Sequence, residues 1–318
     1  MAEITIIMPA YNAENTIDHS IQSVCEQTFD DWELIIVNDG STDDTEGKVF
    51  AWQKKEPRIR YLYQLNQGVS AARNAGINQA TGKYISFLDA DDIWMPEALN
   101  TLYSYIENHP DVKFVYGKTE EIFCDGTHEL VGPAAHDGYL EDFIHKNNEL
   151  RLTYHISAIL IDLSMIRDYD IHFETGIKVS EDTGFFIELM CVTKAYGLNV
   201  VLSKYLRRNG SATGKEEWKP EDWYGQVGIY FCINDFVEKY RPTALLAFHR
   251  MRNFVCYRYV LRCVRNGYVK EAQQYISEWD KYLREFVRSD GKINDKIKCW
   301  FMMHFISSPK FLWLLGRM

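Results

Sequence analysis

Residues 84–92 read Tyr-Ile-Ser-Phe-Leu-Asp-Ala-Asp-Asp, a short apolar run that ends in three carboxylates. Such a run, bounded by polar residues, is typical of a strand that is buried on both faces of a sheet. The same form occurs twice upstream, at Ile4–Met8 before Pro9-Ala10-Tyr11-Asn12 and at Leu34–Val37 before Asn38-Asp39-Gly40. Because ligand sites in open α/β sheets lie beyond the carboxyl ends of the strands, we expect the three polar clusters to meet in one crevice.

Segments with helical spacing separate these runs, which predicts an α/β fold with a Rossmann-like, mostly parallel sheet and flanking helices. The expected helices are 15–27, 42–55, 70–80, 182–195 and one opened by Pro96, and the further strands are 59–63, 112–116, 155–161 and 199–202. We expect this domain to span residues 1–215. A charged stretch at 215–220 leads into a C-terminal region, residues 216–318, whose periodicity is helical.

Charge is unevenly distributed along the 318 residues. The formal net charge is −10, yet residues 241–318 carry 15 Lys and Arg against 6 Asp and Glu. The acidity of the remainder argues against a nucleic-acid partner, because neutralising phosphates needs clustered positive charge. The seven cysteines form no CxxC pair, so we expect free thiols in a reducing compartment. No signal-peptide pattern opens the sequence, and we expect a cytoplasmic protein.

The acidic cluster after residue 88 needs a partner, because carboxylates this close repel one another. Oxygen ligands with an incomplete shell suit Mg²⁺ or Mn²⁺ that also binds phosphate oxygens. In the alternative interpretation, Asp92 caps the helix opened by Pro96, and Asp89 and Asp91 are solvated turn residues.

Five motifs occur in order along the chain: Pro9-Ala10-Tyr11-Asn12-Ala13-Glu14, Val37–Asp43, Asn66–Gly76, Asp89-Ala90-Asp91 and Glu181-Asp182. The ordered set resembles the inverting glycosyltransferases of family 2, which have the nucleotide-sugar-binding fold called GT-A. The resemblance implies a transferase that moves a sugar from a nucleotide-diphosphate donor, expected to be a UDP-sugar, to an acceptor hydroxyl. The expected acceptor is a glycan, a bacterial surface polysaccharide or a lipid-linked sugar.

By this resemblance, the residues after the first two strands bind the nucleotide: Pro9, Tyr11, Asn12, Glu14 and Asp39. Tyr11 would lie against the uracil face, and the Asp39 carboxylate would accept the imide N–H of the base. The alternatives are a packed surface aromatic at Tyr11 and a local turn at Asp39.

The resemblance also assigns Arg73 and Asp89 to the donor nucleotide and Asp91 to a Mn²⁺ or Mg²⁺ ion. The metal would neutralise charge on the departing nucleotide diphosphate. For Arg73 the alternative is a salt bridge to a carboxylate at the edge of the core.

Asp182 is the expected general base, which takes the proton of the acceptor hydroxyl on the face opposite the leaving group. Glu181 and Asp92 are expected on the acceptor side. The alternative is that Glu181 and Asp182 merely begin a helix, as acidic residues often do. A basic turn at 207–211 either closes over the diphosphate or is solvated, and residues 117–154 are expected to select the sugar.

Two other classes of function remain open. A sugar nucleotidyltransferase uses a similar sheet, but it needs a Gly-rich, basic loop after the first strand, which residues 9–14 do not form. A catalytically dead sugar-binding protein is the second alternative, and the intact acidic pairs argue against it.

The C-terminal region contains a helix with five arginines and interleaved aromatics at 249–265. Dense apolar runs follow at 300–306 and 311–315, broken by Ser307-Ser308-Pro309-Lys310. The break argues against a membrane span and for contact with the inner face of the cell membrane, where Trp, Lys and Arg are favoured. Packing on the α/β domain or in a homodimer is the alternative.

Overall fold

The computed structural model describes residues 2–123, 125–132, 138–139, 155–177, 179–207, 219–289, 292–306 and 308. The chain forms two compact units. The first is built from Met1–Phe143, Glu149–Ile177 and Glu181–Glu216, and the second contains Glu217–Met318.

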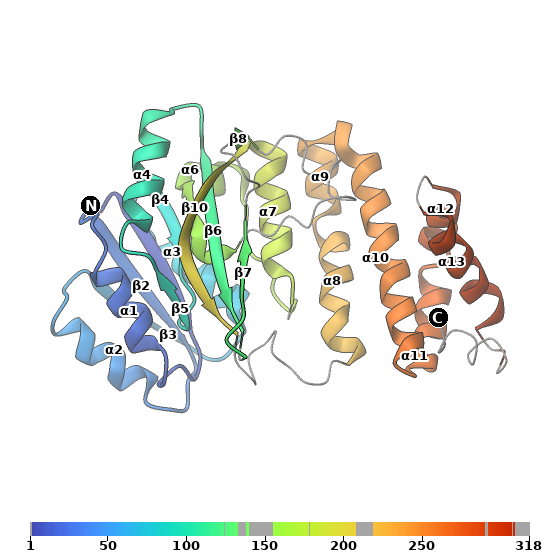
Figure 1. Cartoon of the computed structure of the whole chain (residues 1–318), viewed down its shortest axis with the longest axis horizontal. Coiled ribbons are helices and arrows are strands. Elements are labelled where there is room, and N and C mark those ends of the chain that lie inside the picture. Colours follow the sequence, from blue (N-terminus) through green and yellow to red (C-terminus); the bar gives the residue numbers. More distant parts are fainter. Residues whose placement is uncertain are drawn as a thin grey trace. The chain divides into compact units, whose positions relative to one another are not determined.

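One mixed sheet forms the centre of the first unit (Figure 1). Its described strands run in the order β3-β2-β1-β4-β9-β6-β10-β5, with β7 beside β6 and β8 beside β10. Their bounds are β1 Ile4–Ala10, β2 Trp32–Asp39, β3 Ile59–Gln64, β4 Tyr84–Phe87, β5 Asp92–Trp94, β6 Phe114–Ile122, β7 His128–Val131, β8 Gly138–Tyr139, β9 Ile159–Asp162 and β10 Ala195–Leu206.

The four strands β3-β2-β1-β4 are parallel to one another. Strand β9 is antiparallel to both β4 and β6, and β10 runs parallel to β6. The expected α/β class is therefore confirmed, and the carboxyl ends of β1, β2 and β4 lie at the same edge of the sheet.

Helices cover both faces of this sheet (Figure 1). Alternate residues of β1 point to opposite faces. Ile4, Ile6 and Met8 pack with α1 and α4, and Ile7 faces α3. The helices of this unit are α1 Ile17–Cys25, α2 Thr45–Gln53, α3 Val69–Gln79, α4 Ala98–Asn108, α6 Leu163–Tyr169 and α7 Glu181–Val192, with a 3-10 turn at Ile156–Ala158.

Helix α3 approaches β1 so closely that only glycine fits at one contact. A Cβ atom at Gly76 would lie 2.6 Å from Cγ2 of Ile7. Since this is shorter than a van der Waals contact, Gly76 fixes how near α3 lies to the sheet.

Strand β5 was not expected from the sequence. It begins at Asp92 and pairs antiparallel with β10, with Asp92 opposite Tyr205. The alternative interpretation, in which Asp92 caps the following helix, is wrong, because Glu97 occupies the N-cap position of α4.

The second unit is helical, as expected for the region after the sheet. Its helices are α8 Pro220–Cys232, α9 Asn234–Tyr240, α10 Leu245–Arg265, α11 Val269–Glu278, α12 Asp280–Arg288 and α13 Ile293–Phe305, with a 3-10 turn at Pro242–Ala244. The Arg-rich helix α10 is a core element, because Tyr257 and Tyr259 are buried against residues such as Trp279 and Phe286. No helix in the described part of the chain is long and apolar enough to cross a bilayer.

Candidate functional site

The loops after β1 and β2 are joined by hydrogen bonds. The backbone N–H of Asn12 donates to Oγ of Ser41 (2.9 Å), and Oδ1 of Asn12 accepts from the N–H of Thr42 (2.8 Å). Glu14 repeats the exchange, because its N–H donates to Asp43 and its carboxylate accepts from the N–H of Asp44. Two of the predicted nucleotide residues thus hold the two strand ends together.

Tyr11 and Pro9 lie at the same edge of the sheet. Pro9 is the penultimate residue of β1 and is buried, whereas Tyr11 follows the strand and is 53% exposed. Asn12 next to it has a positive φ of 48°. The aromatic ring of Tyr11 is therefore available to a planar ligand.

Asp39 is buried at the end of β2 and organises the loop that precedes α3. Its Oδ1 accepts from the side chain of Gln64 (2.7 Å) and from the N–H of Gln67 (2.9 Å). Its Oδ2 accepts from the N–H of Gly68 (2.8 Å), which is the N-cap residue of α3. The carboxylate does not make the local turn that was the alternative, since Oδ1 of its neighbour Asn38 accepts from the N–H of Ser41.

Arg73 joins two predicted parts of the site that are far apart in sequence. Its side chain is 3% exposed. One terminal nitrogen donates to Oε1 of Glu181 (2.9 Å), and the other donates to both oxygens of Asp89 (2.8 and 3.1 Å). Its Nε is buried and has no hydrogen-bond partner among the described residues. The salt-bridge alternative is therefore present, and within the described part of the chain the Nε–H is left without a partner in a buried position.

The residue after Arg73 holds the chain that leads to α7. Asn74 donates from Nδ2 to the carbonyl of Phe173 (2.8 Å) and accepts from its N–H (2.9 Å). The guanidinium of Arg73 also lies 5.1 Å from the ring of Phe173. Helix α3 thus positions both Phe173 and the start of α7.

Asp182 lies beside this ion-pair cluster. Burial, followed by the negative charge of Glu181, raises the pKa of Asp182 to about 6. Arg73 opposes this shift, as does the N–H of Thr183, which donates to Oδ1 of Asp182 (2.7 Å). A carboxylate with this pKa is ionised at neutral pH and is a stronger base than an ordinary Asp.

Asp92 is fully buried beneath the acidic turn. The hydroxyl of Ser157 donates to its Oδ2 (2.5 Å), and Nδ1 of His155 lies 3.5 Å from the same oxygen. Burial, together with the charges of Asp89 and Asp91, raises the pKa of Asp92 well above its ordinary range. Asp92 therefore links the acidic turn to the 3-10 turn that contains Ser157.

The carboxylates of the turn Asp89–Asp92 suit a metal ion that takes most of its ligands from a bound substrate. Among the described residues, no three His, Cys, Asp or Glu side chains are grouped to hold a metal ion. Asp89 is paired with Arg73 and Asp92 with Ser157, whereas Asp91 is partly buried at the turn. Mg²⁺ binds in this way, through one or two carboxylates and the oxygens of a bound phosphate.

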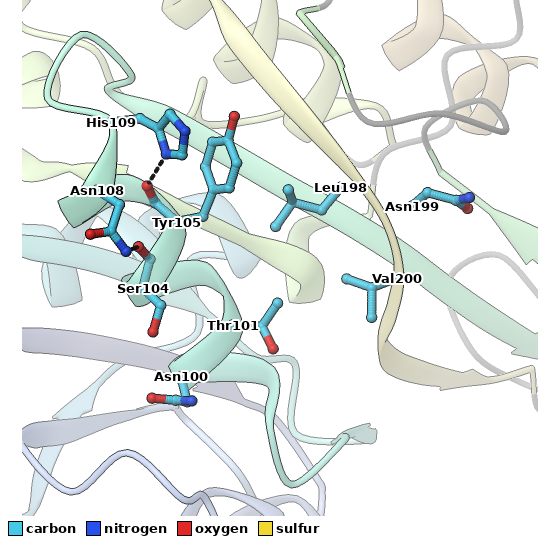
Figure 2. A pocket seen from close by; sticks show the side chains of 9 residues that line it. All are labelled: Asn100, Thr101, Ser104, Tyr105, Asn108, His109, Leu198, Asn199 and Val200. Carbon is cyan, nitrogen blue, oxygen red and sulfur yellow. Dashed lines mark hydrogen bonds between the residues drawn. The ribbon is translucent and has the colours of Figure 1, made fainter.

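A separate hollow lies between α4 and β10, away from these residues (Figure 2). Its volume is about 460 Å³, and most of the surface exposed to it is apolar although several lining side chains are polar. It contains none of the predicted site residues. The stretch expected to select the sugar and the basic turn at 207–211 lie largely outside the described residues.

Sequence reasoning did not single out Ser157, Asn74, Gln64 or Gln67. Asn74 and Gln67 are within the quoted motif 66–76, so their place in it was a usable signal. No sequence signal marked Gln64 or Ser157, because their contacts with Asp39 and Asp92 exist only once the sheet has folded.

Residues 5–170 match the family described as Glycosyl transferase family 2. The glucosyltransferase WfgD of Escherichia coli, named for UDP-Glc and α-D-GlcNAc-diphosphoundecaprenol, is 41% identical over 120 residues, which are 37% of this chain and 46% of WfgD. The putative teichuronic acid glycosyltransferase TuaG of Bacillus subtilis is 29% identical over 225 residues, which are 68% of this chain and 83% of TuaG. The chain spans only 34–39% of the length of three uncharacterised Rickettsia glycosyltransferases that it also matches.

Solved structures show the same fold. S. aureus TarS 1–349 in complex with UDP-GlcNAc has a TM-score of 0.72 at 19% identity, covering 100% of this chain and 91% of TarS 1–349. The mannosyltransferase PcManGT of Pyrobaculum calidifontis, in complex with GDP-Man and Mn²⁺, has a TM-score of 0.59 at 17% identity, covering 99% of this chain and 84% of that one. The sheet and the helices after it are thus of GT-A type. Since the family match covers more than half of the residues, the chain belongs to glycosyl transferase family 2.

Proposed function

We propose that this chain transfers a sugar from a nucleotide-diphosphate donor to an acceptor hydroxyl, with inversion at the anomeric carbon. The observation that carries the proposal is the Arg73 cluster. It brings Asp89, in the turn after β4, to the start of α7, where Asp182 lies. The proposed donor residues and the carboxylate of Asp182 would thereby lie at one edge of the sheet.

The donor would be held by the loops after β1, β2 and β4. Tyr11 offers an exposed ring for the base, and Asp39 retains acceptor capacity on Oδ2 for one N–H. The Nε–H of Arg73 is unsatisfied and would donate to a ribose or diphosphate oxygen. A UDP-sugar is the donor we propose, since TarS was solved with UDP-GlcNAc and WfgD is named for UDP-Glc.

Asp182 would accept the proton of the acceptor hydroxyl as its oxygen attacks the anomeric carbon. The bond from that carbon to the diphosphate breaks, and its electron pair leaves with the nucleotide diphosphate. Glu181 would remain paired with Arg73 and keep the pKa of Asp182 raised. Asp91 would hold a divalent cation, Mn²⁺ or Mg²⁺, which neutralises charge on the diphosphate when bound.

The acceptor we propose is a lipid-linked sugar or growing polysaccharide at the inner face of the cell membrane. The support is that WfgD is named for a diphosphoundecaprenol acceptor and TuaG for teichuronic acid synthesis.

Incubating the full chain with a panel of nucleotide sugars, Mn²⁺ and lipid-linked acceptors tests the proposal. Free nucleoside diphosphate together with a β-linked product from an α-linked donor is expected. Pyrophosphate formed from UTP and a sugar phosphate would instead show a nucleotidyltransferase. Sugar-nucleotide binding without any product would show a binding protein.

A further inference from the structure

Helix α13 has apolar side chains on the face that points to solvent. Five of them are 41–71% exposed and follow helical spacing: Ile293, Ile297, Trp300, Phe301 and Phe305. The opposite face packs into the core of the second unit through Cys299 and Met302. A helix that is apolar on both faces is normally covered on both.

The aromatic side chains of this face contact one another. The ring of Trp300 lies 5.2 Å from Phe301 and stacks on His304 at 4.4 Å, and Phe301 lies 5.7 Å from Phe305. Single exposed apolar residues are common, but a contiguous aromatic patch marks an interaction surface.

The charges next to this face are positive. Lys292, Lys296 and Lys298 lie on or just before α13, and no carboxylate in the described part of the chain pairs with them. The one acidic residue of the helix, Asp295, accepts a hydrogen bond from the hydroxyl of Tyr257 on α10 (3.0 Å) and thus points inward. Three lysines therefore border the apolar face, and none of them has a carboxylate partner among the described residues.

We propose that the outward face of α13 inserts into the surface of an anionic lipid bilayer. Trp and Phe would lie at the boundary between headgroups and acyl chains, while the lysine side chains reach the anionic headgroups. A second copy of the chain fits this face less well. A two-fold contact would bring together two faces that are both bordered by lysines, so like charges would oppose each other.

This surface would hold the enzyme where a lipid-linked acceptor is found, so its purpose rests on the proposed function. Its test does not, because binding to vesicles needs neither donor nor acceptor. If the chain transfers sugar but does not bind vesicles, only the inference drawn from α13 is overturned.

Sedimentation of the full chain with sucrose-loaded vesicles tests the inference. The vesicles contain phosphatidylcholine alone, or phosphatidylcholine and phosphatidylglycerol in about a 3:1 ratio. The variant pairs are Trp300→Ser with Phe301→Ser, and Lys296→Gln with Lys298→Gln. The matched control is Leu246→Ser, which removes a 66% exposed apolar residue from α10 of the same unit.

We expect binding to the anionic vesicles only. Loss of two lysines should weaken it about 20- to 30-fold, since each contributes a factor of about five. The aromatic pair should weaken it at least about tenfold, and Leu246→Ser should leave it unchanged. No binding by the wild type, or equal loss in the control, would overturn the inference. So would a monomer–dimer equilibrium, measured by light scattering, that Trp300→Ser with Phe301→Ser abolishes.

Discussion

Replacing Asp182 with Asn should abolish sugar transfer and raise thermal stability at the same time. The pKa of Asp182 is raised to about 6 from its ordinary 3.8 by burial and by Glu181. At neutral pH its charge is therefore more costly in the folded chain than in the unfolded chain. Asn is neutral and of the same shape, and its amide oxygen still accepts the N–H of Thr183.

The magnitude follows from the shift. About two pKa units correspond to about 3 kcal/mol, and solvent screening of a partly exposed side chain reduces this to about 1–2 kcal/mol. For a unit of about 200 residues the expected rise in Tm is about 2–8 °C. Between pH 3.8 and about 6 the folded state binds the proton more tightly, so the wild-type penalty grows as pH rises through this window.

Circular dichroism melts near pH 4 and pH 7.5 measure this effect. The gap between Asp182→Asn and wild type should be small at the lower pH and complete at the higher one. Glu181→Gln is the matched control with the opposite sign, because it leaves the buried guanidinium of Arg73 with Asp89 alone. A fall in Tm for Asp182→Asn at pH 7.5, or retained transfer, would refute the reasoning.

The same pKa predicts the pH dependence of catalysis. The kcat/KM of the wild type should fall about tenfold per pH unit below pH 6, where Asp182 is protonated. Glu181→Gln removes a charge that raises this pKa, so its acid limb should move to lower pH. A limb that stays in place would belong to a different group.

Three further substitutions test the site and its support. Gly76→Ala should lower the free energy of unfolding by about 1–3 kcal/mol in urea titrations, because its Cβ meets Ile7 at 2.6 Å; unchanged stability would contradict the close packing. Asp39→Asn loses one acceptor oxygen toward the loop at Gly68, and should raise the KM for the donor about tenfold with kcat nearly unchanged. In Arg73→Lys a single ammonium group replaces the two terminal nitrogens that bind Glu181 and Asp89 separately, so kcat/KM should fall at least about tenfold. Equal activity would remove the cluster from the mechanism.

The strands were predictable wherever their apolar runs are continuous. Ile4–Met8 and Leu34–Val37 lie within β1 and β2, and the polar residues that follow them meet through Asn12 and Ser41. The short strand β5 was not predictable. It has three residues, begins with a carboxylate, and exists because β10, more than a hundred residues later, pairs with it.

Residue types in the motifs pointed to the site, but they did not show which side chains pair. Asp92 looks like a surface residue in sequence, and its burial depends on Ser157, which no local pattern marks. The pairing of Arg73 with Glu181 was equally hidden, because the two residues are 108 positions apart.

That separation also orders events during synthesis. Asp89 follows Arg73 by 16 residues, whereas Glu181 follows it by 108. At about 5–20 residues per second, the ribosome adds Glu181 roughly 5–20 s after Arg73. Until then the guanidinium can neutralise only Asp89, and α7 has not been made. Among the proposed site residues, the carboxylate proposed to activate the acceptor is therefore the last to be synthesised.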